Sequence, residues 1–378
     1  MARDLVFGFW HETWASAVER QFMPPDRLAT SLLMHDAVGR LIVANPFRSG
    51  PTQLARYVMG RRQAQFPSSV AARLFSPMRL RREDGTDRPA LERTYRDYDQ
   101  RLESAAKKLG LDRPALITTN PFHAAYAPLE WAGPVTYYGW DDWVALPVLD
   151  RWRSSLEDAY SCIRARGHRV CAVSQPLLDR LDPIGPGVVT PNGITPAEWQ
   201  PPWASSPAMR SLPGPRMLYV GAIHNRLDLS AFAELSRAFA SGSIVVVGPV
   251  ADQAVLASLR MLSNVHIWGA LPRREIAGLI RDADVCLMPH LKNALTVSMS
   301  PLKIYEYCAA GRPSVATDLP PVRNIHQAVH LVEEGGSFPA TVARALEYGP
   351  MPEDQRHNFV VENAWSRRHD DILRFALD

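Results

Sequence analysis

The chain has 378 residues, of which 46% are hydrophobic and 21% charged, and its formal net charge at pH 7 is +3. This length predicts two domains that each bury a core, and the near-neutral charge excludes the basic surface of a nucleic-acid-binding protein. The four cysteines show no Cys-x-x-Cys spacing, which argues against a zinc site and for a reducing compartment.

In the first half of the chain, short apolar runs alternate with polar segments, as expected of parallel strands that alternate with helices. Strands are predicted at residues 4–9, 41–45, 115–119, 135–138 and 170–174. Residues 50–110 are rich in arginine, but acidic residues are interleaved, so a solvated face is the simpler interpretation. Ligands of such a sheet gather at the carboxyl ends of its strands, and functional residues are expected there.

Polar and aromatic residues follow several of these strands. His11 follows the first strand and His123 the third, and the two are alternative candidates for a contact near the transferred group. Asp141 and Asp142 lie between two tryptophans, where a carboxylate can have a raised pKa and act as a general base. We predict Asp141 as the catalytic carboxylate, with Asp142 second. The structural alternatives are a helix N-cap for one aspartate, core packing for each histidine and an aromatic loop packed on a neighbour.

The second half begins after a proline-rich stretch, residues 195–215, which is interpreted as an interdomain linker. The strand that starts at Arg216 runs into a turn at Gly221, where a diphosphate can approach the backbone. Arg226 can neutralise such an anion. Further strands alternate with helices up to the strand at residues 284–290, so a second parallel sheet is predicted.

The most informative stretch is residues 298–317, which reads as a loop, a helix, a tight stop and a strand. Ser300 is predicted to cap the helix, which then begins at Pro301. A helix N-terminus attracts phosphate, Lys303 adds a point charge, and Glu306 is suited to accept hydrogen bonds from sugar hydroxyls. The alternative is an ordinary surface helix with a Lys303/Glu306 pair.

The pattern Ser-Pro-x-Lys-x-x-Glu-Tyr-x-Ala-x-Gly-x-Pro-x-Val in this stretch resembles the donor-site motif of GT-B glycosyltransferases, especially those like glycosyltransferase family 4. Within them it is similar to the teichuronic-acid and polysaccharide-type transferases. The resemblance implies an α/β fold of two Rossmann-like domains that face each other across a cleft. Residues 1–194 would form the acceptor domain, 195–215 the linker and 216–364 the donor domain, and a C-terminal helix, 365–378, would cross back to the first domain.

The resemblance further implies a hexosyltransferase that moves a sugar from a nucleotide diphosphate-sugar to a hydroxyl of a saccharide, lipid-linked or natural-product acceptor. A UDP-sugar is expected before a GDP- or dTDP-sugar, with no obligatory metal or other cofactor and with retention at the anomeric carbon. Inversion stays open, since Asp141 can serve as a base.

The resemblance also implies donor-site roles for individual residues. Glu306 matches the second glutamate of the family's Glu-x7-Glu motif, which holds the ribose, and Ser298 stands eight positions earlier, where the family has the first glutamate. Trp268, Gly269 and Leu271 match the segment that reads the base. Trp268 is as readily explained as a core residue.

Two other functions stay open. One is a nucleotide-sugar 2-epimerase, which needs no acceptor site and against which the aromatic, acidic loop at residues 137–143 argues. The other is a catalytically degenerate partner subunit, which Ser298 permits. No apolar run has the ~20 residues of a membrane span and the sequence opens with no signal-peptide pattern, so a cytoplasmic protein is expected. Peripheral contact with the inner membrane face is a further option, since basic helices in such first domains often meet anionic or lipid-linked acceptors.

Overall fold

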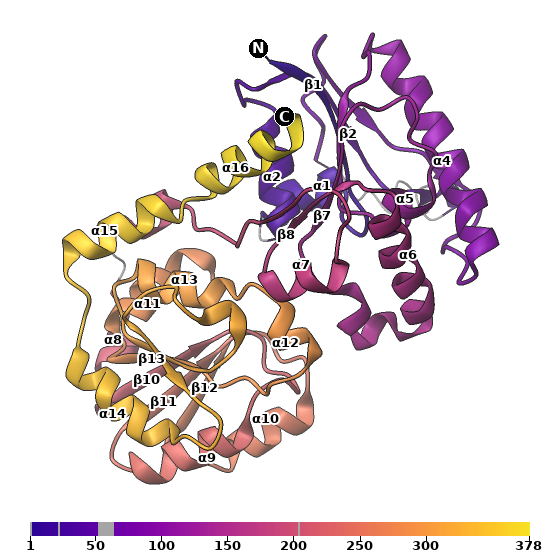
Figure 1. Ribbon diagram of the computed structural model, residues 1–378. Helices are drawn as coiled ribbons and strands as arrows, with labels where there is room; N and C mark the ends of the chain where they lie inside the picture. The colour runs from indigo at the N-terminus through magenta and orange to yellow at the C-terminus, as the bar shows by residue number, and fades with distance from the viewer. Residues whose placement is uncertain (1, 22, 52–63, 203–204) are drawn as a thin grey trace. The chain divides into compact units, whose positions relative to one another are not determined.

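The computed structural model describes residues 2–21, 23–51, 64–202 and 205–378 (Figure 1). The chain divides into two compact units. Unit 1 comprises Met1–Pro191 and Arg368–Asp378, and unit 2 comprises Asn192–Arg367. Part of the arginine-rich stretch, at residues 52–63, lies outside the described residues.

The described residues of unit 1 form a seven-stranded parallel sheet in the order β4-β2-β1-β6-β7-β8-β9. Its strands are β1 (Arg3–Gly8), β2 (Val38–Ala44), β4 (Ala72–Phe75), β6 (Ala115–Thr118), β7 (Val135–Gly139), β8 (Arg169–Ala172) and β9 (Gly187–Val189). A separate parallel pair joins β3 (Arg48–Ser49) to β5 (Met78–Arg79). The strands β6 and β7 are buried along their whole length, as parallel strands covered on both faces must be. The predicted strands of this half are confirmed.

Helices cover this sheet. They are α1 (Trp14–Arg20), α2 (Pro24–Leu32), α4 (Arg88–Lys108), α5 (Pro121–Tyr126), α6 (Arg153–Ala165), α7 (Gln175–Leu181) and the last part of α16 (Trp365–Leu377), with short 3-10 helices at Trp143–Ala145 and Pro147–Trp152. The side chain of Asn120 caps α5 by accepting the N–H groups of Phe122 and His123. These caps satisfy backbone donors that the helices cannot satisfy themselves.

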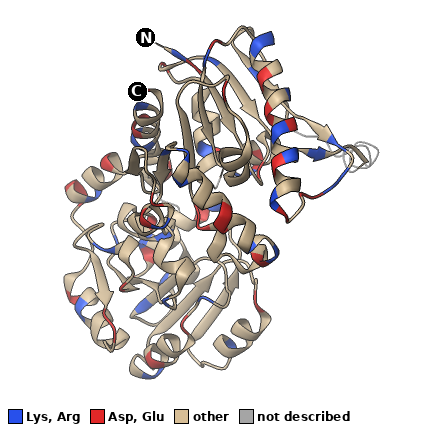
Figure 2. Ribbon diagram, turned by 45° about the vertical axis from the view of Figure 1, so that its right-hand side comes forward, with Lys and Arg blue, Asp and Glu red and all other residues tan. Residues whose placement is uncertain are grey.

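The long helix α4 belongs to the arginine-rich stretch. Its charges pair along the helix at i,i+4 spacing, as between Arg88 and Glu92 at 2.8 Å and between Arg101 and Asp97 at 2.9 Å. Figure 2 shows basic and acidic residues next to one another along α4. The interpretation of a solvated face is confirmed for this helix.

Unit 2 is built on a six-stranded parallel sheet of the described residues, in the order β12-β11-β10-β13-β14-β15. Its strands are β10 (Arg216–Val220), β11 (Ser243–Val247), β12 (Val265–Gly269), β13 (Val285–Met288), β14 (Ser314–Thr317) and β15 (Val329–Val332). Its helices are α8 (Pro207–Arg210), α9 (Leu229–Ala238), α10 (Gln253–Arg260), α11 (Arg273–Asp282), α12 (Ala294–Ser298), α13 (Leu302–Ala309), α14 (Phe338–Tyr348) and α15 (Glu353–Glu362), with 3-10 helices at Pro196–Trp199 and Pro320–Val322. The strand order reverses between β10 and β13 in unit 2, and between β1 and β6 in unit 1. In open sheets of this kind, ligands bind at such reversals.

The described residues of the stretch 195–215 differ from the expected linker, because they pack into unit 2. Trp199 is 1% exposed and Met209 is fully buried in the core of this unit. The guanidinium of Arg356 donates to the carbonyl oxygens of Trp199 and Ala309, both at 2.9 Å, and so fastens the stretch to α13. Proline content alone cannot tell a linker from a packed irregular segment. The acceptor and donor roles of the two units stay predictions.

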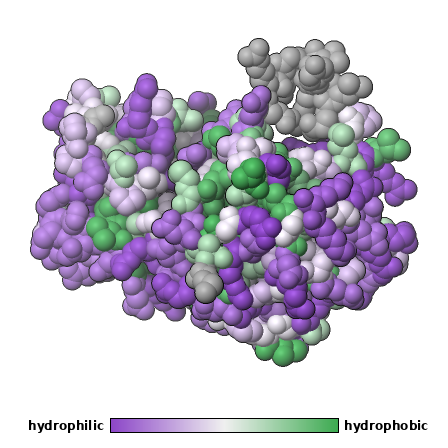
Figure 3. All heavy atoms as spheres, turned by 90° about the horizontal axis from the view of Figure 1, so that it is seen from above, coloured by the Kyte–Doolittle hydropathy of each residue, from purple (hydrophilic) through white to green (hydrophobic). Residues whose placement is uncertain are grey.

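Hydrophilic residues predominate on the face drawn in Figure 3, where hydrophobic residues form small groups. Among the helices of the described residues, none combines the length and the apolar character that crossing a membrane requires.

Candidate functional site

Three glycines stand at the carboxyl ends of neighbouring strands in unit 2. Gly221 follows β10, Gly248 follows β11 and Gly269 ends β12, with φ angles of 152°, 151° and 69°. The N–H of Gly248 donates to the carbonyl oxygen of Gly269 at 2.7 Å, and a Cβ on Gly248 would lie 2.0 Å from the carbonyl oxygen of Gly221. All three positions therefore favour glycine for their backbone conformation, and close packing adds a second reason at Gly221 and Gly248.

The side chain of Lys303, from α13, points to the first of these turns. Its Nζ donates to the hydroxyl of Tyr219 at 3.0 Å and lies 3.2 Å from Nε2 of His290. A Cβ on Gly221 would lie 2.8 Å from the same nitrogen. Tyr219 belongs to β10 and His290 follows β13, so the ammonium lies at the reversal of strand order in unit 2. We call Lys303, Tyr219, His290 and Gly221 the Lys303 cluster.

The electrostatics of this cluster favour an anion. Burial and the nearby charge of Arg226 lower the pKa of Lys303 to about 7, although Glu306 acts in the opposite direction. Burial and the charges of Lys303 and Arg226 also lower the pKa of His290, so this imidazole is neutral at pH 7. The shift at Lys303 measures how unfavourable the positive charge is in the absence of a ligand. A bound diphosphate would remove that penalty.

Glu306 lies one turn after Lys303, and its side chain is 8% exposed. It forms an ion pair with Arg273 of α11, which also pairs with Glu198 at 2.8 Å. The sequence did not predict this ion pair. A carboxylate has several acceptor sites, so Glu306 can bind Arg273 and still accept a hydrogen bond from a sugar hydroxyl.

Ser300 does not cap α13, and this prediction was wrong. Its hydroxyl accepts the backbone N–H of Asn192 at 3.0 Å, and the side-chain amide of Asn192 donates to the carbonyl oxygen of Ser300 at 2.7 Å. The helix begins at Leu302, with Pro301 at the N-cap position and no side-chain cap. The hydroxyl that was predicted to cap the helix thus binds the backbone of Asn192 instead.

The other donor-site residues predicted from the sequence lie in unit 2 as well. Ser298 ends α12, and its hydroxyl donates to the carbonyl oxygen of Ala294 at 2.8 Å. Trp268 and Leu271 are half-buried and pack against the core of the unit, which suits the structural alternative for Trp268. The carbonyl of Gly269 already accepts the N–H of Gly248. Contacts of Ser298, Ser300, Trp268, Gly269 and Leu271 with a donor stay predictions.

Unit 1 has a cavity of about 200 Å³ at the carboxyl ends of β1, β2 and β6, which we call the unit 1 cavity. His11 from the loop after β1 and Arg48, the first residue of β3, line it, together with Phe122 of α5. The His11 ring stacks on Trp10, with 3.7 Å between the ring centroids. Burial lowers the pKa of His11 to about 4, so this residue is neutral at pH 7.

The other two predicted catalytic residues do not line the unit 1 cavity. His123 is 1% exposed, and its Nε2 lies 3.6 Å from Oδ1 of Asp99, in the core of the unit. Asp141 is half-buried after β7 and accepts the N–H of Asp142 at 2.9 Å. Asp142 itself is fully buried and pairs with Arg180 at 3.0 Å. The catalytic roles of Asp141 and His123 stay predictions, and the surroundings of His123 match its structural alternative.

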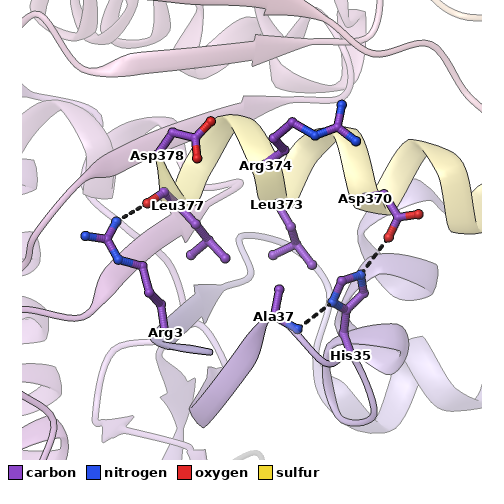
Figure 4. A pocket seen from close by; sticks show the side chains of 8 residues that line it. All are labelled: Arg3, His35, Ala37, Asp370, Leu373, Arg374, Leu377 and Asp378. Atoms are coloured by element: carbon purple, nitrogen blue, oxygen red, sulfur yellow. Dashed lines mark hydrogen bonds and ion pairs between the residues drawn. The ribbon is translucent and has the colours of Figure 1, made fainter. Parts of the chain in front are cut away.

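A larger hollow of unit 1, of about 650 Å³, lies where α16 packs beside β1 (Figure 4). The Nε2 of His35 lies 2.8 Å from Oδ1 of Asp370 there, and the Nδ1 of His35 accepts the N–H of Ala37 at 3.2 Å. The predicted site residues are not part of its lining. These contacts hold the C-terminal helix.

Sequence reasoning missed three residues around the predicted donor site: Tyr219, His290 and Arg273. His290 directly follows the predicted strand at residues 284–290, so the rule of carboxyl strand ends could have found it. Tyr219 and Arg273 carry no such signal. Among the described residues, no group of three or more His, Cys, Asp or Glu side chains is arranged to hold a metal ion. Metal independence itself stays a prediction.

Residues 214–348 match the family model described as Glycosyl transferases group 1. A curated protein of Bacillus subtilis (strain 168), the candidate teichuronic acid biosynthesis glycosyltransferase TuaH, is 26% identical over 166 residues. The matched part is 42% of this chain and 42% of that protein, so the match spans less than half of the curated relative.

Two solved structures are similar over nearly the whole chain. Sucrose-phosphate synthase from Thermosynechococcus elongatus gives a TM-score of 0.70 at 12% identity, over 98% of this chain and 97% of that one. Anabaena Alr3699/HepE in complex with UDP gives 0.61 at 12% identity, over 98% of each chain. The predicted GT-B fold of two Rossmann-like units is confirmed. The family match covers residues 214–348, and the similarity to the solved structures shows the fold.

Proposed function

We propose that this GT-B protein, whose residues 214–348 match the glycosyl transferases group 1, moves a sugar from a nucleotide diphosphate-sugar to a hydroxyl of an acceptor. The preferred donor is a UDP-sugar, and a GDP- or dTDP-sugar is the second choice. A similar structure in complex with UDP supports this ranking. The reaction needs no obligatory metal and retains the configuration at the anomeric carbon.

One observation carries the proposal: the Lys303 cluster at the reversal of strand order in unit 2. Lys303 and Arg226 supply positive charge beside a glycine turn at which a diphosphate can approach the backbone. When the glycosidic bond of the donor breaks, negative charge develops on the departing diphosphate. Cations already in place stabilise this charge without having to rearrange, which lowers the barrier. Glu306 then holds the ribose of the nucleotide.

The acceptor binds in the unit 1 cavity. Half-buried aromatic rings in its lining, those of Phe47 and Trp152, can pack against a sugar ring. The neutral His11 can accept or donate a hydrogen bond to an acceptor hydroxyl without adding charge.

The test is a calorimetric titration of the full chain with UDP, GDP, dTDP, CDP and ADP. We expect one nucleotide to bind, and Lys303→Met to weaken its binding by at least about tenfold, because a charge-assisted contact is worth about 1.5–3 kcal/mol. Lys292→Met is the matched control, since Lys292 is an exposed lysine of the same unit outside the cluster. Absence of binding, or equal effects of the two variants, would contradict the proposal.

Turnover separates this function from its alternatives. A transferase consumes the donor and glycosylates an acceptor, whereas a 2-epimerase converts the donor sugar in the absence of any acceptor. A degenerate partner subunit, which Ser298 permits, would bind the nucleotide without turning over any nucleotide-sugar. Chromatography of reactions with and without a mixed saccharide acceptor pool distinguishes the three.

A further inference from the structure

We propose that the acceptor carries an anionic group, a carboxylate or a phosphate, and that Arg82 binds this group at the unit 1 cavity with Arg48 beside it. This inference rests on the proposed transferase function and names the chemical class of its acceptor.

The position of the cavity marks it as a ligand site of unit 1. It lies at the carboxyl ends of β1, β2 and β6, and the strand order of the sheet reverses between β1 and β6. Its volume of about 200 Å³ corresponds to roughly seven waters at ~30 Å³ each, comparable with one sugar ring. The cavity therefore suits a single saccharide unit.

The charges around the cavity are unequal. Among the residues that the structure describes, its lining has three arginines, Arg48, Arg79 and Arg82, against two carboxylates, Glu83 and Asp84. His11 adds no positive charge at pH 7, because burial lowers its pKa to about 4. The excess of one positive charge is of the sign that attracts an anionic ligand.

Both carboxylates are already engaged. Asp84 pairs with Arg79 and accepts the hydroxyl of Tyr95 at 2.9 Å. Glu83 pairs at 2.6 Å with Arg151, which is outside the lining. Within the described part of the chain, Arg82 forms no ion pair with a carboxylate, so its guanidinium is available to a ligand.

Arg48 is oriented toward the same loop as His11. Its Nη2 donates to the hydroxyl of Thr13 at 3.4 Å, which ties this side chain of β3 across to the loop after β1. A guanidinium binds a carboxylate or a phosphate through paired N–H groups, which gives direction as well as attraction. Arg82 therefore offers an anion such a fork at the cavity that Arg48 also lines.

Aromatic rings supply the surface for the rest of the acceptor. Phe47 and Trp152 line the cavity together with Phe122, and the indole N–H of Trp152 donates to the carbonyl oxygen of Gly85 at 3.3 Å, which holds its ring in place. A sugar ring packs on such faces, while its anionic substituent reaches the arginines. A neutral sugar would use the aromatic rings and leave the arginine charge without a ligand.

The experiment is a calorimetric titration of the full chain, saturated with UDP, with three probes: glucuronate, glucose 6-phosphate and glucose. We expect at least one of the two anions to bind at least about tenfold more tightly than glucose, and its affinity to fall as salt is added. The probe that binds more tightly tells a carboxylate from a phosphate. Equal binding of glucose and the anions, or no binding of any probe, overturns the inference.

Two variants locate the site. Arg82→Gln is expected to weaken binding of the preferred anion by at least about tenfold. Arg81→Gln is the matched control: it changes the neighbouring exposed arginine, which lines a different hollow of unit 1, and should leave the affinity unchanged. An equal loss in both variants, or no loss in Arg82→Gln, overturns the inference.

The same samples keep this inference apart from the proposed function. UDP binding without any preference for anionic saccharides overturns the anionic acceptor and leaves the transferase function standing. Absence of binding of all five nucleotides to the unaltered protein contradicts the transferase function, whereas an anion preference that depends on Arg82 would still establish the unit 1 site.

Discussion

The Nε2 of His290 lies 3.2 Å from the ammonium nitrogen of Lys303, and the hydroxyl of Tyr219 lies 3.0 Å from that same nitrogen. Both partners orient the ammonium without neutralising it, since burial and the charges of Lys303 and Arg226 hold the pKa of His290 below its usual range. The lysine is thus positioned at the Gly221 turn with its charge available to a ligand.

Binding of UDP should depend on pH through Lys303. With a pKa of about 7, this lysine is protonated below pH 7 and loses its charge as the pH rises, so UDP affinity should fall above pH 7, by up to tenfold per pH unit. At pH 8, where UDP is already fully ionised, binding should take up close to one proton. Calorimetry in buffers of different ionisation enthalpy measures this uptake.

Lys303→Met is the control for this dependence, because it removes the titrating group and should abolish both the slope and the proton uptake.

In the unliganded protein, stability should change with pH in the opposite direction to UDP affinity. The pKa of Lys303 is lowered on folding from 10.5, so the unfolded chain binds more protons between about pH 7 and 10.5. The contribution of this group to the free energy of unfolding therefore rises with pH in that window.

For the binding experiment, a UDP affinity that stays constant between pH 6 and 9 would contradict the role of Lys303 as the titrating group.

His290→Leu should weaken UDP binding about threefold to tenfold, because the ammonium loses an acceptor worth about 1 kcal/mol. It should also move the pH midpoint of UDP binding to lower pH, since the protonated lysine is less well stabilised. His290→Gln keeps an acceptor and should restore part of the affinity. His330→Leu, on β15 of the same unit, is the matched control. If the midpoint stays in place in His290→Leu, the histidine has no role in positioning Lys303.

Gly221→Ala should impair UDP binding, whereas Gly335→Ala should not. Both glycines have a positive φ, 152° and 77°, so both variants should lose about 1–3 kcal/mol of stability through backbone strain. An added Cβ at Gly221 would also lie 2.8 Å from Nζ of Lys303 and displace it, while one at Gly335 meets nothing within 4 Å. Thermal unfolding and UDP titration of the two variants separate these effects. Equal UDP affinity in both would show that the Gly221 turn is not at the donor site.

Glu306→Gln should weaken UDP binding by about tenfold or more, because the ribose loses a charged acceptor. Binding of inorganic pyrophosphate, which lacks a ribose, should hardly change. Glu198→Gln is the matched control, because Glu198 is the second carboxylate of Arg273 but lies on the exposed side of that pair. If Glu306→Gln lowers stability and leaves UDP affinity intact, the carboxylate serves Arg273 and not the ribose.

Much of unit 2 could be predicted because its signals are local. Apolar runs marked the strands, Gly221 and Gly269 marked their carboxyl ends, and the spacing of Lys303 and Glu306 placed both side chains one turn apart on a single helix. In unit 1, His11 was found by the same rule of strand ends. His123 and Asp141 satisfied that rule equally well, yet they lie outside the lining of the unit 1 cavity, since the rule identifies an edge of the sheet and not the direction of a side chain.

The sequence by itself determined the two parallel sheets and the helix that presents Lys303, because hydrophobic periodicity and backbone requirements act over a few neighbouring residues. The tertiary structure decided which side chains meet. Tyr219 reaches Lys303 across 84 positions, Arg273 reaches Glu306 across 33, and Asn192 takes the hydroxyl of Ser300 across 108. Such contacts depend on how elements pack, and a sequence pattern does not encode that packing locally. The helix that carries Lys303 and Glu306 was therefore predictable, whereas the ion pair of Glu306 and the partners of Lys303 were not.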